Sequence, residues 1–240
     1  MAFFKKKYCD ICGEKIGLLG NRKLEDGNMC KKCAGLLSPY FTGRRKTSLS
    51  DIKDHLAYRE ENKKLVSEFN VTRTIGGKTR VLLDEDGQKF IVTSYSRWQN
   101  ENPDVIDFSQ VTGCETEICE YRTEQKWKDP DGNQVSYSPR RYDIDYDFYI
   151  TIGLNSPWFD QIHFKINDQR VAIRGSVEYR EMERQSNEIK VVLRQMRQEV
   201  RESIAAASEP KIAQTCPFCG ATTTPDVSGR CEFCGGAVEG

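Results

Sequence analysis

The sequence predicts an α+β protein in which a long C-terminal helix caps a central antiparallel β-sheet, with a small cysteine-rich module on either side. Three observations support this class. Apolar and polar residues alternate over residues 142–154, a narrow apolar stripe runs through residues 177–207, and Cys-x-x-Cys pairs lie near both ends of the 240-residue chain. We expect an N-terminal module over 1–45, a helical linker over 46–71, a sheet domain over 72–207 and a C-terminal module over 208–240.

Strand signals dominate the sheet domain. Residues 80–83 and 89–92 flank an Asp-Glu-Asp-Gly sequence that is typical of a hairpin turn. A strand over 111–126 leads to a second turn at 129–133, and a short strand over 162–166 comes after the alternating strand. Because consecutive strands fold back on one another, we expect an antiparallel sheet. The apolar face of the alternating strand comprises Tyr142, Ile144, Tyr146, Phe148, Ile150, Ile152 and Leu154.

The polar face of the alternating strand carries Asp143, Asp145 and Asp147. A hairpin centred on the second turn would place Tyr142 opposite Glu120 and would bring basic residues of the 111–126 strand within reach of this row. We therefore expect the three carboxylates to lie at the surface and to pair across strands. A cation site is the alternative.

Two helices are expected. Residues 50–69 form an amphipathic helix that Ser48 or Ser50 can cap, with Asp51 in its first turn and His55 solvated. The helix over 177–207 either covers the sheet or pairs with another helix, and we favour the sheet. His163, the only other histidine, is expected on the sheet surface. The apolar stripes comprise Ile52, Leu56, Leu65, Val66 and Phe69 in the first helix, and Met182, Ile189, Leu193, Met196 and Val200 in the second.

Eight cysteines form two sets with the spacing of metal ligands. In the first set seventeen residues separate the two pairs, and in the second set eleven do. Two residues between cysteines allow a tight turn to direct both sulfurs at one ion, and four thiolates suit tetrahedral Zn²⁺. The sequence therefore predicts two zinc ions, held by Cys9, Cys12, Cys30 and Cys33 and by Cys216, Cys219, Cys231 and Cys234.

The predicted role of both metals is structural, because four cysteines leave no open coordination position. Gly13, Gly220 and Gly235 directly follow three of the four pairs, where the turn favours a residue that tolerates positive φ. Iron held by the same ligands is an alternative, whereas a redox dithiol would require a different surrounding fold. Cys114 and Cys119 are expected on opposite faces of their strand and therefore not to share a metal.

Positive charge is concentrated at the N-terminus although the whole chain is formally neutral. Residues 1–50 contain eleven Lys and Arg and four Asp and Glu, a net charge of +7. Such a surface can contact the phosphates of nucleic acids or anionic lipids, or it can be solvated or contact a protein. The candidate contact residues are Lys5, Lys6, Lys7, Lys31, Lys32, Arg44, Arg45 and Lys46.

The cysteine motif and the residues between its pairs resemble a known domain. Cys9-x-x-Cys12-Gly13, the Leu-Leu-Gly at 18–20, the Asp-Gly at 26–27 and Cys30-x-x-Cys33 are similar to the N-terminal zinc ribbon of a family of uncharacterised bacterial proteins. The resemblance implies a pleckstrin-homology-like sheet domain, to whose strand entry residues 105–113 are similar. It implies no enzymatic activity. The C-terminal cysteine module resembles a generic zinc ribbon.

The resulting hypothesis is a non-enzymatic bacterial zinc protein that acts as an adaptor or scaffold and recognises protein partners. No apolar run is long enough to span a bilayer, and the first residues lack the apolar segment of a signal peptide, so we expect a cytoplasmic protein. The alternatives are a nucleic-acid-binding regulator that uses the basic N-terminus and a protein associated with anionic membranes. The oligomeric state is left open, because the apolar stripe of the long helix can also mediate dimerisation.

Overall fold

The computed structural model describes residues 6–208, 213–224 and 229–238. The chain divides into two compact units, residues 1–198 and 199–240, and each is described by itself. Lys5 and residues 209–212, near the start of the expected C-terminal module, lie outside the described residues.

The N-terminal module consists of two short hairpins and a short helix. Strand β1 (Lys7–Tyr8) pairs with β2 (Lys15–Ile16), and β3 (Arg22–Lys23) pairs with β4 (Asn28–Met29). Helix α1 (Lys31–Ala34) and the 3₁₀ turn η1 (Arg44–Lys46) come next in the chain. Leu24 and Met29 are buried together with Cys9, Cys30 and Cys33, so these three cysteines belong to the module's core.

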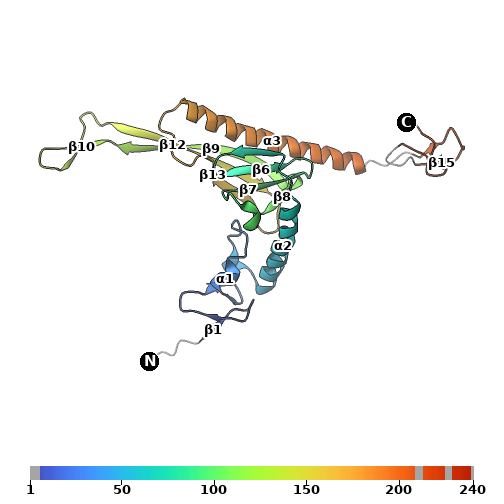
Figure 1. The fold of residues 1–240 in the computed structure, drawn as a ribbon, viewed down its shortest axis with the longest axis horizontal. Helices are drawn as coiled ribbons and strands as arrows, with labels where there is room; N and C mark the ends of the chain where they lie inside the picture. The colour runs from blue at the N-terminus through green and yellow to red at the C-terminus, as the bar shows by residue number, and fades with distance from the viewer. Residues whose placement is uncertain (1–5, 209–212, 225–228, 239–240) are drawn as a thin grey trace. The chain divides into compact units, whose positions relative to one another are not determined.

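Helix α2 (Leu49–Glu68) connects this module to the sheets (Figure 1). Ser48 caps it as predicted, since its side-chain oxygen accepts a hydrogen bond of 3.1 Å from the backbone N–H of Asp51. The first half of α2 contributes Ile52 to the core of the N-terminal module. The second half contributes Val66 to an apolar cluster with Leu82, Ile91, Trp98 and Val105. One helix therefore packs into two separate cores.

Two antiparallel sheets form the centre of the first unit. Strands β5 (Arg73–Gly76), β6 (Arg80–Asp84), β7 (Lys89–Thr93) and β8 (Val105–Asp107) pair in chain order. In the second sheet, β12 (Tyr142–Leu154) lies between β9 (Val111–Glu124) and β13 (Gln161–Lys165). The 3₁₀ turns η2 (Trp98–Asn100) and η3 (Phe108–Gln110) flank β8. The predicted hairpin of residues 80–92 and the antiparallel arrangement are confirmed.

The ends of β9 and β12 continue into an extended hairpin arm, defined here as residues 121–145 (Figure 1). Strands β10 (Lys126–Lys128) and β11 (Gln134–Ser136) form its outer part. Tyr142 pairs with Glu124 rather than with Glu120, so the predicted register is wrong by four residues. The reason is that residues 137–141 separate β11 from β12, whereas Gln125 alone separates β9 from β10.

The expectation that Asp143, Asp145 and Asp147 all lie at the surface is wrong for Asp147. Asp143 is exposed, but Asp147 is buried, and its side-chain oxygen Oδ1 accepts a 3.0 Å hydrogen bond from the amide of Asn167. Lys165 and Arg170 lie 3.3 and 3.5 Å from its carboxylate oxygens. The end of β13 and the loop after it therefore cover this carboxylate and neutralise it, a contact that the strand pattern does not reveal.

Within the first unit, helix α3 (Val177–Ser208) packs on the sheets (Figure 1). This is the arrangement that we favoured over pairing with another helix. The ring of Tyr179 contacts those of Tyr146 and Phe148 at centroid distances of 5.1 Å. The guanidinium of Arg197 donates to the backbone oxygen of Thr112 on β9 at 2.8 Å. In the second unit, β14 (Gln214–Thr215) and β15 (Thr222–Thr223) form a short hairpin.

Candidate metal centres and a buried polar joint

Four cysteines converge in the N-terminal module. Cys9 and Cys12 lie in the turn between β1 and β2, Cys30 precedes α1, and Cys33 lies within α1. Their Sγ atoms all lie within 4.8 Å of one another. Cys9, Cys30 and Cys33 are buried, whereas Cys12 reaches the surface.

The turn that carries Cys9 and Cys12 is closed by backbone hydrogen bonds. The N–H of Gly13 donates to the oxygen of Cys9 at 2.8 Å, and the N–H of Cys9 donates to the oxygen of Glu14 at 2.9 Å. Gly13 has a φ of +73°, which explains why glycine stands directly after this pair. The same two hydrogen bonds and a positive φ recur in the turns of residues 216–221 and 231–236, at Gly220 and Gly235.

The fourth pair has a different local structure. Cys30 caps α1, and the backbone N–H of Cys33 donates to its sulfur at 3.3 Å. Ala34 comes next as a helical residue in place of glycine. The N–H of Ala34 donates to the oxygen of Cys30 at 3.0 Å, as in the other three turns, but here the chain continues as a helix. The absence of a glycine after Cys33 was the available sequence signal.

The C-terminal centre consists of two matching turns. Cys216 and Cys231 are buried, Cys219 and Cys234 are exposed, and the four Sγ atoms again lie within 4.8 Å of one another. The N–H of Phe218 donates to the sulfur of Cys216 at 3.4 Å. Backbone donors of this kind stabilise a thiolate and orient it toward an ion.

Sulfur separations test whether a metal fits these clusters. Four sulfurs at about 2.3 Å from a central Zn²⁺ form a tetrahedron with edges of about 3.8 Å. The distance from Cys12 to Cys30 is 3.8 Å, that from Cys216 to Cys234 is 3.6 Å, and that from Cys219 to Cys231 is 3.8 Å. Both clusters have the size and donor set of a tetrahedral four-thiolate metal site, and both are consistent with zinc.

The environment of the thiols favours an ion further. Burial raises the pKa of Cys9, but backbone donors from Cys12, Cys30 and Ile11 outweigh it and lower the pKa to about 6. Burial and the neighbouring thiols raise the pKa of Cys33. A first thiolate therefore forms readily, whereas later ones require a cation that offsets their mutual repulsion.

The basic residues singled out from the sequence do not form one patch. Lys6 and Lys7 line a hollow with Lys15, while Arg44, Arg45 and Lys46 line another hollow beside η1. Lys31 and Lys32 are exposed on α1. The guanidinium of Arg44 donates to the backbone oxygen of Lys23 at 2.6 Å, and its pKa is lowered by burial and by the charges of Arg45 and Arg22.

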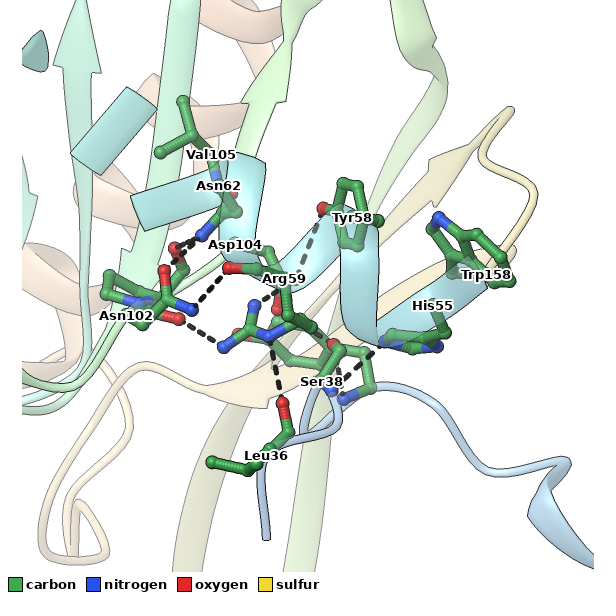
Figure 2. A network of polar contacts seen from close by, with 12 residues as sticks. Leu36, Ser38, His55, Tyr58, Arg59, Asn62, Asn102, Asp104, Val105 and Trp158 are labelled. Carbon is green, nitrogen blue, oxygen red and sulfur yellow. Dashed lines mark hydrogen bonds and ion pairs between the residues drawn. The ribbon is translucent and has the colours of Figure 1, made fainter. Parts of the chain in front are cut away.

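A buried ion pair joins the N-terminal module, α2 and the first sheet (Figure 2). The Arg59 guanidinium lies 2.7 Å from the carboxylate of Asp104 and donates to the backbone oxygens of Leu36 and Asn102. Asp104 also accepts hydrogen bonds from the hydroxyls of Ser38 and Tyr58, at 2.8 and 3.2 Å. Burial raises the pKa of Asp104, and Arg59 and the hydroxyls oppose that rise. We call this group of contacts the polar joint.

Two asparagines complete the polar joint (Figure 2). The amide of Asn62 donates to the side chain of Asn102 and to the backbone oxygen of Pro103, both at 2.7 Å, and its oxygen accepts from the N–H of Val105 at 2.9 Å. Asn102 has a φ of +47° and donates to the backbone oxygen of Arg59. The turn before β8 is therefore held in an unusual conformation by side chains of α2.

His55 belongs to the same buried face, which corrects the expectation that it is solvated. It is fully buried, and its Nε2 accepts a 3.2 Å hydrogen bond from the N–H of Ser38. Rings of Phe41, Tyr58 and Trp158 lie around it, with centroids at 4.6–5.8 Å. Burial and the charge of Arg59 lower its pKa to about 4, so the imidazole is neutral.

The buried residues of α2 have a helical spacing that the sequence interpretation missed. Ile52, His55, Arg59, Asn62 and Val66 recur at intervals of three and four residues and face one side. The three central members are polar, so a search for apolar stripes omits them. Polar residues that fall between two apolar anchors of one face were the signal for the polar joint.

A model of one protein family matches part of this chain. Residues 7–55 match the family described as "Domain of unknown function (DUF4428)", a segment that includes the first metal centre, α1 and the start of α2. No curated protein and no solved structure matches the chain. Among the described residues, no helix combines the length and apolar character that crossing a bilayer demands.

Zinc content tests the two centres separately. We expect the intact chain to carry two Zn²⁺ ions and Cys9→Ser to carry one, because each site requires all four thiolates. The matched control is Cys119→Ser, which changes a cysteine outside both clusters and should leave two ions. Mass spectrometry of metal per chain after gel filtration measures this. A Cys9→Ser protein with two ions, or an intact protein with fewer than two, would contradict the prediction.

Removal of one partner of the buried ion pair should strongly destabilise the first unit. We expect Asp104→Ala to lower the free energy of unfolding by about 3 kcal/mol or more, because Arg59 is left charged and buried. Lys63→Ala is the control, since its pair with Glu60 is exposed and worth about 0.5 kcal/mol or less. Urea denaturation followed by tryptophan fluorescence compares the variants. Equal effects of the two substitutions would show that the joint contributes little.

Stability should depend on pH through His55. Its folded pKa of about 4 lies below the value of about 6.5 in an unfolded chain, so stability is fully present above pH 6.5 and falls as the pH decreases toward 4. Between pH 7 and pH 5 the loss should be about 2 kcal/mol larger in the intact protein than in His55→Gln. Asp104, whose shift has the opposite sign, is common to both proteins and cancels in the comparison. Parallel pH profiles of urea unfolding would refute this role.

Proposed function

We propose that the protein is a non-enzymatic, zinc-stabilised adaptor or scaffold of the bacterial cytoplasm that recognises a protein partner. The observation that carries the zinc assignment is the pair of four-thiol clusters, whose Sγ atoms all lie within 4.8 Å of one another and in three pairs lie 3.6–3.8 Å apart. Four protein ligands complete a tetrahedral shell and leave no position for substrate or water. On this proposal both ions stabilise folded modules that present surfaces for contact.

A pleckstrin-homology-like arrangement of the sheet domain is part of this proposal. Four antiparallel strands, β5 to β8, precede the antiparallel strands β9, β12 and β13 and then the long helix α3. This order supports the expectation of a bent antiparallel sheet with a C-terminal helix. Such a fold does not determine function, so the partner must be inferred from a surface.

The hairpin arm supports the assignment of a protein partner. Within the described residues, positions 142–145 of β12 pair with β9 alone, so this part of the hairpin has no further strand beside it. Trp127 and Val135 form a cross-strand pair near its tip, and both are exposed, as is Tyr142. Aromatic side chains that give up water on contact supply much of the binding energy at protein interfaces. We therefore assign partner recognition to the arm.

The arm assignment is tested by cross-linking and affinity capture from the cells in which the protein occurs. We compare the tagged intact chain with Trp127→Ser/Val135→Thr and with Lys31→Glu/Lys32→Glu, which alters exposed charge on α1. The proposal expects a set of proteins that the arm variant loses and the lysine variant retains. If the arm variant keeps every partner, while nuclease treatment and the lysine variant remove them, the protein is instead a nucleic-acid-binding regulator.

A further inference from the structure

The turn between β2 and β3 presents two leucines to solvent. Leu18 and Leu19 are 86% and 88% exposed, and no other large apolar side chain among the described residues exceeds 72%. They occupy the central positions of the four-residue turn at 17–20. Neither belongs to the buried cores of the described chain, so their apolar character does not serve the fold.

The turn is held firmly by its surroundings. The N–H of Gly20 donates to the oxygen of Gly17 at 3.0 Å, which closes the turn. The guanidinium of Arg22 donates to the backbone oxygen of Leu19 at 3.2 Å. The β1–β2 hairpin on one side and the β3–β4 hairpin on the other are anchored in the core that contains the metal ligands. The two leucines are therefore displayed on a fixed support.

Basic side chains lie beside the base of this turn. Lys6, Lys7 and Lys15 line a hollow of about 490 Å³ together with Leu18 and Asn21. Residues 6–23 contain five Lys and Arg against Asp10 and Glu14, a net charge of +3. The carboxylate of Asp10 accepts a hydrogen bond from the backbone N–H of Asn28 at 2.6 Å. Two exposed leucines thus lie next to a hollow lined by three lysines, in a segment with excess positive charge.

We propose that the turn at residues 17–20 docks the N-terminal module on the surface of an anionic lipid bilayer. Leu18 and Leu19 enter the boundary between headgroups and acyl chains, while Lys6, Lys7 and Lys15 contact lipid phosphates and carboxylates. Charge complementarity selects this occupant, because lysines attract anionic headgroups and only a bilayer also offers an apolar layer directly beneath them. A nucleic acid would use the lysines but has no comparable layer for two adjacent leucines.

This docking is independent of the arm, so either assignment can fail without the other. A protein that contacts a membrane through one end and a partner through residues 121–145 would bring that partner to the bilayer. We expect weak, reversible attachment to the bilayer. The apolar turn alone and the lysines alone would each bind only marginally, and the two together would bind measurably.

Vesicle sedimentation of the full-length zinc-loaded chain tests the proposal. We use vesicles of phosphatidylcholine with about one third phosphatidylserine, and vesicles of phosphatidylcholine alone. Leu18→Ser/Leu19→Ser should reduce the bound fraction on anionic vesicles about tenfold or more, and Lys7→Glu/Lys15→Glu should do so as well. Ile173→Ser/Val177→Ser is the matched control, because it removes two exposed apolar side chains elsewhere. A zinc content of two ions verifies that each variant is folded.

Insertion is measured separately with Leu19→Trp. Vesicles that carry bromine on their acyl chains should quench the added fluorescence, whereas the native tryptophans of the parent chain should change little. Loss of binding in the lysine variant with full binding in the leucine variant would overturn the proposal, since attraction would then be electrostatic alone. No sedimentation with anionic vesicles, or binding to duplex DNA or RNA in its place, would overturn it equally.

Discussion

The ion pair between Arg59 and Asp104 determines how the N-terminal metal module is attached to the rest of the first unit. Arg59 lies on α2, Asp104 precedes β8, and the hydrogen bonds that complete the pair come from Leu36 and Ser38 of the metal module. Three segments that are far apart in the chain therefore all contribute to one buried ion pair and its hydrogen bonds. Because an unpaired buried charge is costly, none of the three can move away alone. These contacts fix the positions of the two apolar cores into which α2 packs.

Local pattern was sufficient wherever a residue's role depends on near neighbours. The alternation in β12, the 80–92 hairpin and the Ser48 cap of α2 all arise from interactions within a few residues. His55 and Asp147 could not be placed in this way. Each is polar and buried because of partners elsewhere in the chain, Ser38 for His55 and Asn167 for Asp147. A polar residue on a helix or strand looks the same from the sequence whether water or such a partner satisfies it.

The metal centres illustrate the same division. The gathering of eight cysteines into two clusters can be predicted from spacing, because two intervening residues bring sulfurs together in a turn and in a helix start alike. The difference between the two centres depends on the residue directly after each pair. Three pairs end in a glycine with positive φ, whereas Cys33 is succeeded by Ala34 within α1. The N-terminal centre is thereby tied to a helix and to the loop that enters the polar joint, and the C-terminal centre consists of two equal turns.

The short distance along the chain between Cys33 and the polar joint has a thermodynamic consequence. Leu36 and Ser38 lie three and five residues beyond the fourth ligand, and Ile52 of α2 lies in the same core as the ligands. We therefore expect metal occupancy of the first cluster and the alignment of α2 with the first sheet to be linked equilibria. If a bound ion favours the aligned state by a given factor, the aligned state must bind that ion more tightly than the unaligned state by the same factor. The metal affinity of the first centre would then report on the state of the polar joint, although the ion itself would not contact the joint.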